Sequence, residues 1–291
     1  MIIPMHELLQ DAKLHHYGVA APNVFNRETI EAAFQAGREL KAPIILDVHP
    51  VHGIYECAAI ARFFERRYPE VTAALNLDHG GTYEQAVQAI HAGFSSVMVD
   101  RSTLPFRENV EQVREIVKIA HVVGVSVESE LGHVGQGDEY AQTRDSGLTR
   151  PEEAAAFVKE TGTDCLAVAV GTSHGVYRGT PKLEFGLLRT LAEELPIPLV
   201  LHGGSGTGDQ NLVETIRCGI QKINLNTDLN EGGLRHLKQA SDEDFRRQVQ
   251  GAGGEMNTKR MNLQQTIQTG VDGWKEVLKY YIKLFGGENR A

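Results

Sequence analysis

Residues 198–206 read PLVLHGGSG, a short apolar run that leads directly into a histidine and a glycine-rich turn. The same arrangement recurs along the chain, because each short apolar or β-branched run is followed by polar residues and then by a helical pattern. Short runs of this composition between turn residues indicate buried strands. They occur at residues 18–22, 43–48, 72–77, 96–99, 125–127, 165–170, 198–201 and 222–225.

Helices are expected between these strands. Thr82 with Gln85 forms the pattern of a capping box, and Gly93 is placed to end that helix. Another helix is expected to start after Thr149 and to end at Gly162. Strands that alternate with helices predict a parallel sheet. Eight such units favour an α/β fold of the (β/α)8 TIM barrel type over a doubly wound sheet, which usually has fewer strands.

The length of 291 residues fits one barrel, because barrels of about 250 residues routinely form a single domain. We therefore predict one domain over residues 1–291, with no linker or low-complexity segment. The segment 231–291 is polar, helical and long, and it ends in a cluster of aromatic residues. It is interpreted as the last barrel helix followed by a C-terminal helical extension that packs on a partner subunit.

The overall charge and composition exclude several classes of protein. The net charge of -9 argues against a nucleic-acid-binding surface. No apolar run approaches the about 20 residues that span a bilayer, and the N-terminus carries a charge too early for a signal peptide. The cysteines Cys57, Cys165 and Cys218 are odd in number and far apart, which predicts reduced thiols. A cytoplasmic protein with no membrane partner is expected.

Polar residues follow every predicted strand, and in a barrel these strand ends meet at one rim, where barrel enzymes carry out their chemistry. Three ends place a histidine beside glycine: His79, His174 and His202. Neutral imidazole is a preferred zinc ligand, and three protein ligands leave a coordination position open. A single histidine here would more often be structural, but three at one barrel mouth predict a zinc site. His49, His52 and His133 also lie near the rim, and their roles stay open.

The ends of the seventh and eighth strands resemble a phosphate site. Residues 203–208 offer backbone N–H groups and hydroxyls to an anion, and Asn224 and Thr227 follow on the next strand. The loops after strands seven and eight commonly bind phosphate in barrel enzymes. A glycine-rich turn can also be a tight connection without a ligand.

Several motifs together resemble one known family. They are Asp78-His79, residues 127–132 (VESELG), 171–175 (GTSHG), 201–206 (LHGGSG) and 222–227 (KINLNT). Their order and spacing resemble those of the class II, zinc-dependent ketose-bisphosphate aldolases, and the tagatose- and fructose-bisphosphate branch is the most similar. The resemblance extends from the first helix to the C-terminus.

The resemblance implies that His79, His174 and His202 hold the catalytic Zn²⁺. It also implies that Asp100 and Glu130 lie where a second divalent metal, or the displaced zinc, can bind. The backbone near Gly175 and Gly203 matches a place for a monovalent cation.

The dihydroxyacetone phosphate half of the substrate has its expected site at Asn23, Gly175, Gly203, Gly204, Ser205, Asn224, Asn226 and Thr227. Asn226 stands where many relatives have aspartate or alanine. These positions imply a small phosphorylated sugar as the partner molecule. A homodimer or homotetramer, with the C-terminal helices at its interface, is expected by analogy.

The chemistry of aldol cleavage agrees with these residues. Breaking the C3–C4 bond of a ketose 1-phosphate or 1,6-bisphosphate leaves a carbanion beside the C2 carbonyl, and a zinc ion can stabilise the resulting enediolate. Asp78 is expected to take the proton of the C4 hydroxyl. In the condensation direction a second base must remove a proton from C3. Asp138 or Glu139, in a glycine-containing segment typical of a lid, is expected to be this base, unless the segment is a solvated acidic loop.

The half of the site that selects the aldehyde departs from the family pattern. Asp47 and His49 replace small or hydroxyl residues after the second strand, and an acid there would repel phosphate unless it is paired with His49 or an arginine. Arg101 and Arg290 are the candidates to bind the distal phosphate. The alteration raises the alternative of an aldehyde partner other than glyceraldehyde 3-phosphate, including one without phosphate.

Two other functions remain as alternatives. A metal-dependent sugar-phosphate epimerase would also use zinc, acids and a phosphate loop. A non-catalytic partner subunit of an aldolase would not need Asp78 or three ligating histidines.

Overall fold

Eight parallel strands form the centre of the molecule in the computed structural model, which describes the chain except for residues 136–144, 146, 176, 178 and 251–260. The strands are β1 (Val19–Pro22), β2 (Ile44–Val48), β3 (Ala73–Gly80), β4 (Ser96–Val99), β5 (Ser126–Leu131), β6 (Cys165–Val168), β7 (Leu199–Leu201) and β8 (Ile220–Leu225). They pair in the order β1-β8-β7-β6-β5-β4-β3-β2. A bridge between Asn23 and Asp47 joins β1 to β2 and closes the barrel. The predicted (β/α)8 fold is confirmed.

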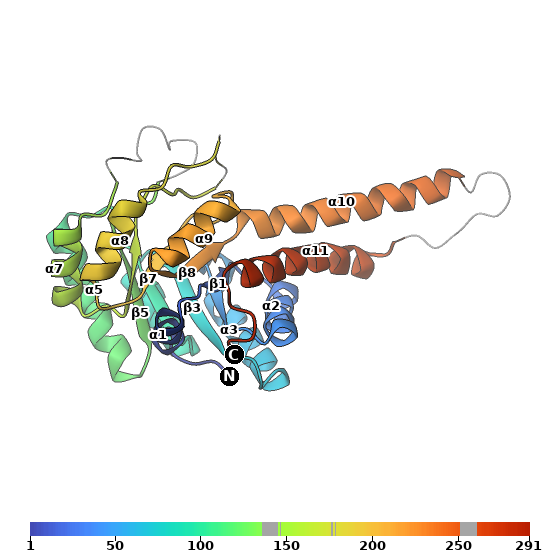
Figure 1. Ribbon diagram of the computed structural model, residues 1–291. Coiled ribbons are helices and arrows are strands. Elements are labelled where there is room, and N and C mark those ends of the chain that lie inside the picture. The colour runs from blue at the N-terminus through green and yellow to red at the C-terminus, as the bar shows by residue number, and fades with distance from the viewer. Residues whose placement is uncertain (136–144, 146, 176, 178, 251–260) are drawn as a thin grey trace.

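Helices surround the barrel, as Figure 1 shows. Those connecting or following the strands are α2 (Arg27–Leu40), α3 (Ile54–Arg67), α4 (Tyr83–Ala92), α5 (Phe106–Val122), α7 (Pro151–Thr161), α8 (Phe185–Glu194), α9 (Asp209–Arg217), α10 (Thr227–Gln250) and α11 (Leu263–Leu284), with a short 3-10 turn η1 (Pro50–His52) before α3. Their apolar faces cover the outside of the sheet, and the branched and aromatic side chains between helices and strands form the main core. No described helix combines the length and apolar character that crossing a membrane requires.

Both helix-end predictions are confirmed only in part. Thr82 accepts a hydrogen bond from the backbone N of Gln85, and Gly93 ends α4 with a left-handed conformation. The capping box is incomplete, because the side chain of Gln85 accepts from the backbone N of Gly81 and not from that of Thr82. Helix α7 does end at Gly162, but Arg150 rather than Thr149 precedes its first residue. The hydroxyl of Thr149 instead donates to the carbonyl of Leu131, because the residue is buried against β5.

The N-terminal ends of the strands are closed by helix α1 (Met5–His15). Met5, Leu8 and Leu9 are buried, and they pack in one cluster with barrel residues such as Ile45 and Val200. Removing this apolar surface from water contributes to stability and seals one end of the barrel. The opposite end, where the strands terminate, is left for the loops that carry the polar residues.

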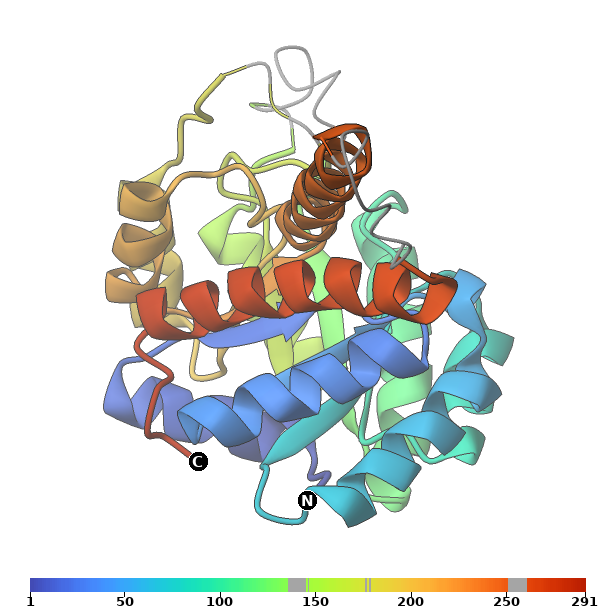
Figure 2. The ribbon, with the colours of Figure 1, turned by 90° about the vertical axis from the view of Figure 1, so that its right-hand side faces the viewer.

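Helices α10 and α11 form an antiparallel hairpin that projects from the barrel (Figure 1). Helix α11 returns to the barrel and lies beside α2, as the turned view in Figure 2 shows. Leu234, Leu263, Ile267 and Tyr280 are exposed on this hairpin. The expectation that this segment lies between copies of the chain stays a prediction, since a single chain does not test it.

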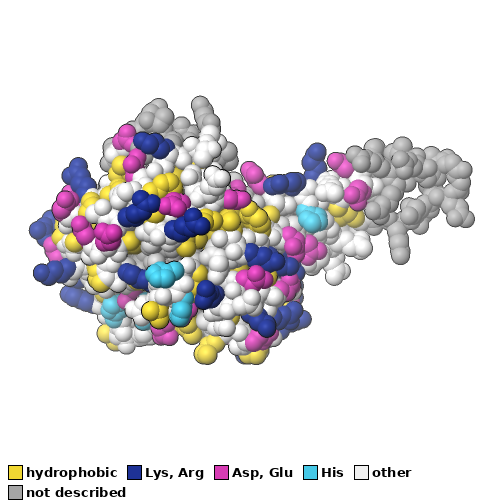
Figure 3. Space-filling view, viewed as in Figure 1, with side chains coloured by type: hydrophobic (Ala, Val, Ile, Leu, Met, Phe, Trp, Pro, Cys, Tyr) yellow, Lys and Arg dark blue, Asp and Glu magenta, His cyan; other side chains and the backbone are white. Residues whose placement is uncertain are grey.

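The surface seen in Figure 3 carries acidic and basic side chains in close alternation over the barrel helices. One such pair is formed by Arg150 and Glu153 at the start of α7, at 3.4 Å. Exposed pairs of this kind contribute little to stability because water screens them. The residues that carry chemistry are instead gathered at the carboxyl ends of the strands.

Candidate active site

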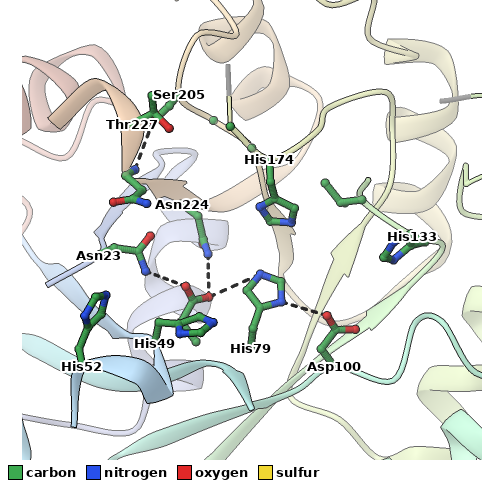
Figure 4. Close-up of a pocket in the computed structure, with 16 residues that line it drawn as sticks. Asn23, His49, His52, His79, Asp100, His133, His174, Ser205, Asn224 and Thr227 are labelled. Carbon is green, nitrogen blue, oxygen red and sulfur yellow. Dashed lines mark hydrogen bonds and ion pairs between the residues drawn. The ribbon is translucent and has the colours of Figure 1, made fainter. Parts of the chain in front are cut away.

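A cavity of about 480 Å³ opens at the carboxyl ends of the strands. Residues at or just after the ends of the strands line it, and most of them are polar, as Figure 4 displays. The described lining residues are Asn23, His49, His52, Asp78, His79, Asp100, His133, Val134, His174, Gly175, Gly203, Gly204, Ser205, Asn224, Asn226 and Thr227. The structure therefore brings together most of the residues that the sequence pointed to.

Three imidazole rings converge at the centre of this cavity. The ring centroids of His79, His174 and His202 lie 4.7, 5.0 and 5.6 Å apart in the three pairings. One nitrogen from each ring lies within 4.8 Å of the others. Imidazoles usually spread apart unless a shared ligand or hydrogen bonds hold them, so this spacing is suited to one metal ion.

His202 is oriented by a buried carboxylate. Its Nε2 lies 3.0 Å from Glu128 Oε1, and both side chains are completely buried. Because Glu128 accepts the Nε2 proton, Nδ1 carries a free lone pair. Nδ1 has no hydrogen-bond partner among the described residues. An unpartnered buried nitrogen that faces two other imidazoles fits a metal ligand, because burial without a partner is otherwise costly.

His79 is held in an unusual backbone conformation at the end of β3. Its φ angle is +50°, and the strand register shifts between Leu77 and Gly80. Residues other than glycine seldom adopt positive φ, and such strain concentrates at functional sites. Nδ1 of His79 lies 2.9 Å from Asp100 Oδ2, which leaves Nε2 facing the other two rings.

The electrostatic environments of His79 and His174 differ. Burial opposes protonation of His79, but the nearby carboxylates, Asp78 first, outweigh burial and raise its pKa to about 10. Burial and the two neighbouring imidazoles lower the pKa of His174 to about 3. His174 is therefore neutral and ready to ligate, whereas His79 must lose a proton before it can bind a metal ion.

Asp78 lies beside the histidines, and its carboxylate is fixed by two amides. Asn23 Nδ2 donates to Oδ2 at 2.7 Å, and Asn224 Nδ2 donates to Oδ1 at 3.2 Å. Burial acts to raise the pKa of Asp78, but His79 and Lys222 outweigh it and lower that pKa well below its usual range. The carboxylate is thus ionised and aimed at the cavity.

A second group of possible ligands shares one residue with the first. Asp100 and Glu130 gather with His79, again with ligand atoms within 4.8 Å. Burial and the neighbouring Asp100 raise the pKa of Glu130. Glu130 Oε2 has no hydrogen-bond partner among the described residues and lies 3.4 Å from Nδ1 of His202. The two groups of possible ligands are adjacent, because they share His79.

The glycine-rich loop after β7 is drawn tightly against the loop after β6. A Cβ atom on Gly203 would lie 2.2 Å from the carbonyl oxygen of Ser173, and its φ angle is +67°, so only glycine fits. The hydroxyl of Tyr177 bridges these loops, since it lies 2.8 Å from the oxygen of Ser173 and 2.9 Å from that of Gly203. The loop is therefore held in one conformation beside the histidines.

The backbone of this loop offers donors to the cavity. The amides of Gly204 and Ser205 have no partner among the described residues. Asn226 and Thr227 lie across from them at the N-terminus of α10. Unpaired amides beside a helix N-terminus favour an anion.

The expected position of Asp47 is wrong. It was expected on the rim, paired with His49 or an arginine, but its side chain is completely buried inside the barrel. Lys222 Nζ lies 3.1 Å from Asp47 Oδ2 and 2.7 Å from Glu128 Oε2. Asn76 Nδ2 donates to both carboxylates, at 2.9 and 3.2 Å. Asp47 therefore contacts a buried lysine and does not face a substrate phosphate.

Two arginines were also expected to reach the substrate, and neither does in this chain. Arg101 is buried and donates to the backbone oxygens of Gly80 and Asp100, at 3.0 and 2.7 Å. Arg290 lies at the opposite end of the barrel, where the amides of its neighbours bond to the backbone before β2. Its guanidinium lies 5.4 Å from the ring centre of Tyr17. The lid acids Asp138 and Glu139 lie outside the described residues.

Glu128, Lys222 and Asn76 were not recognised as a connected group from the sequence. Glu128 alternates with Glu130 along β5, and Lys222 with Asn224 along β8, so all four face the barrel interior. This alternation is a sequence signal for side chains that face the barrel interior. The contact between Glu128 and Lys222 could not be predicted from it, because β5 and β8 are distant in sequence and meet only in the closed barrel.

Comparison with known proteins identifies the family of the chain. The family described as fructose-bisphosphate aldolase class-II matches residues 3–290. The fructose-bisphosphate aldolase of Helicobacter pylori strain J99 is 34% identical over the full length of both chains. The crystal structure of the YdjI aldolase from Escherichia coli K12 matches with a TM-score of 0.84 and 28% identity, over all of both chains.

A fructose-bisphosphate aldolase structure from Campylobacter jejuni is only 20% identical, covers 100% of this chain and 97% of its own, and its TM-score of 0.82 supports the fold. The family assignment rests on the full-length family match and on the Helicobacter pylori relative, and not on the fold alone. The resemblance inferred from the motifs is confirmed: the chain belongs to the class II fructose-bisphosphate aldolase family, a family of lyases.

Proposed function

We propose that this chain is a zinc-dependent aldolase that reversibly cleaves a ketose 1,6-bisphosphate, of the fructose or tagatose type, to dihydroxyacetone phosphate and an aldehyde. The observation that carries the proposal is the convergence of three imidazoles beside an ionised, amide-held carboxylate and a glycine-rich loop. Family membership favours aldol cleavage over an epimerase. The complete set of polar groups argues against a non-catalytic subunit.

His79, His174 and His202 would hold the zinc ion. Their fit rests on the unpartnered buried Nδ1 of His202 and on the short distances among the three rings. When bound, zinc supplies Lewis-acid stabilisation of the negative charge that develops on the substrate oxygens. Asp100 and Glu130 would hold a second or displaced divalent ion, and a monovalent cation site near Gly175 and Gly203 stays a proposal.

Asp78 would move the proton of the C4 hydroxyl. As the C3–C4 bond breaks, that hydroxyl becomes a carbonyl and its proton passes to a carboxylate oxygen of Asp78. Asn23 and Asn224 orient the carboxylate, so that the transfer needs little reorganisation. The proton at C3 would be handled by Asp138 or Glu139 in the segment that follows β5.

The phosphate at C1 would lie on the loop after β7. The amides of Gly204 and Ser205 can donate to it, and Asn226 and Thr227 complete the site at the start of α10. Asn224 Oδ1 is buried without a hydrogen-bond partner among the described residues, so it can accept from a substrate hydroxyl. These contacts would place the C3–C4 bond between the histidines and Asp78.

A second candidate is an aldolase for a ketose 1-phosphate whose far end lacks phosphate. The described residues lining the cavity include His49, His52 and His133 but no lysine or arginine. Burial lowers the pKa of His49, so this imidazole would offer hydrogen bonds rather than charge. This chemistry suits hydroxyl groups at the distal end.

A substrate panel separates the two candidates. Release of dihydroxyacetone phosphate would be measured with fructose and tagatose 1,6-bisphosphates and with the matching 1-phosphates, with and without a chelator. The first candidate predicts that the bisphosphates have a kcat/KM at least about tenfold higher, because a second phosphate contributes a charge-assisted contact. The second predicts equal or better cleavage of the 1-phosphates. Chelator-resistant release, or none from any sugar by the zinc-loaded protein, would contradict both.

Asp78→Asn tests the proton transfer. The substitution removes the proton acceptor but leaves the three histidines, so kcat should fall about 10²- to 10⁴-fold while zinc content is unchanged. Steady-state cleavage and metal analysis on the same sample check this. An activity within a few-fold of the wild type would show that another group carries the proton.

Glu128→Gln tests the orientation of His202. The glutamine amide cannot offer a negative charge to the Nε2 proton, so zinc affinity should fall about 10- to 100-fold. Competition with a chromogenic chelator measures the affinity, and circular dichroism checks the fold. Glu111→Gln, on the exposed face of α5, is the matched control and should bind zinc like the wild type. Equal affinities in the two variants would mean that Glu128 has no part in metal binding.

Zinc binding should also depend on pH, because His79 is protonated in the metal-free protein and zinc binds only neutral imidazole. The affinity should rise about tenfold per pH unit between about pH 7 and 9, with about one proton released from His79 per ion. Calorimetry in buffers of different ionisation enthalpy counts the released protons. Binding heats that do not vary with the buffer would contradict this pKa.

A further inference from the structure

A short hydrogen-bonded chain connects α11 with the glycine-rich loop. The hydroxyl of Tyr281 donates to Oδ2 of Asp228, the second residue of α10. The backbone N of Gly206 donates to the same oxygen at 2.9 Å. One carboxylate oxygen therefore joins the C-terminal helix to the loop that follows β7.

Ser205 also connects the loop after β7 to the start of α10, here through a side chain of the loop and backbone groups of the helix. Its Oγ accepts hydrogen bonds from the backbone N of Asn226 and from that of Asp228, each at 3.2 Å. The loop and the N-terminus of α10 are thus cross-linked by Ser205 on one side and by Asp228 on the other. These contacts fix the direction in which the unpaired amides of Gly204 and Ser205 point.

The carboxylate of Asp228 would weaken anion binding if its side chain could change rotamer freely. A carboxylate close to a phosphate repels it, and a side chain at the start of a helix has several accessible rotamers. Tyr281 restricts Asp228, because the tyrosine is only 8% exposed and packs against Phe285 with ring centres 5.5 Å apart. Burial and the adjacent Asp228 raise the pKa of Tyr281, so the hydroxyl remains a donor at neutral pH.

We propose that Tyr281 is a positioning residue for the phosphate end of the site. Through Asp228 it holds the Gly206 amide, and with it the loop of residues 203–206, in the conformation that binds the substrate phosphate. This inference rests on the proposed function. It makes the base of the α10–α11 hairpin part of the support for the substrate.

The chain provides its own matched control in the neighbouring tyrosine. Tyr280 is 48% exposed, and its hydroxyl donates to Asp209 at the start of α9. Asp209 makes no hydrogen bond to the backbone of residues 203–206 in the described structure. Removing either hydroxyl deletes one tyrosine–carboxylate contact, but only Tyr281 acts on the loop.

The test compares Tyr281→Phe, Tyr280→Phe, Asp228→Ala and the double variant Tyr281→Phe/Asp228→Ala, all zinc-loaded. The KM and kcat for the best ketose phosphate would be measured, together with the dissociation constant of inorganic phosphate by calorimetry. Tyr281→Phe should raise both KM and the phosphate constant about fivefold, because it removes a hydrogen bond to a charged group, while kcat stays within about twofold. Tyr280→Phe should match the wild type.

The double variant separates positioning from general destabilisation. If Tyr281 acts through Asp228, the phosphate constant of the double variant should equal that of Asp228→Ala alone. Additive effects, equal constants for the two tyrosine variants, a loss confined to kcat, or no phosphate binding by the wild type would overturn the inference. Failure of the proposed function is distinct: the wild type would then release no dihydroxyacetone phosphate, while phosphate binding still tests Tyr281 without turnover.

Discussion

The ammonium group of Lys222, held between Glu128 and Asp47 inside the barrel, is the interaction on which the site depends. All three side chains are completely buried, and a buried charge without its partner costs several kcal/mol. Lys222 therefore allows Glu128 to stay ionised in the core, with its Oε1 directed at His202. Burial raises the pKa of Asp47 to about 8 despite Lys222. Glu128 therefore supplies most of the negative charge that balances the ammonium group of Lys222. The geometry of the histidine cluster thus begins in the barrel interior.

The two ends of the barrel differ in the side chains that they carry. Helix α1 fills the N-terminal end with apolar side chains and closes it. The carboxyl end keeps its polar groups, among them His79 with its positive φ angle. This division is typical of barrel enzymes, in which a packed scaffold presents a functional rim. Helix α11 adds support from outside through Tyr281 and Asp228.

The sequence was sufficient for the fold because each strand contains a short run of mainly apolar or β-branched residues. The sequence underestimated the length of β5, which carries charged side chains inside the barrel. β5 continues beyond Val127 through Glu128 and Glu130, because interior charges that are paired do not end a strand. An apolar-run criterion ends this strand at Val127 and cannot anticipate such pairing.

The candidate site was predictable where function requires a residue type at a strand end, as for the three histidines and Asp78. Asp47 was misplaced because its partner Lys222 belongs to a distant strand, and no local pattern shows that contact. Arg290 was misplaced because the path of the chain after α11 depends on backbone hydrogen bonds with Leu40 and Lys41. Local sequence patterns therefore do not predict the polar contacts that cross the barrel, and these contacts require the three-dimensional structure.

The central claim is that His79, His174 and His202 together bind one zinc ion beside Asp78. Anomalous diffraction at the zinc absorption edge, from crystals of the zinc-loaded protein, tests it most directly. The account predicts one strong peak about 2.0–2.1 Å from a nitrogen of each histidine, with Nδ1 as the ligand atom of His202. A peak bound by other residues, or no peak at these histidines in protein that contains stoichiometric zinc, would contradict it.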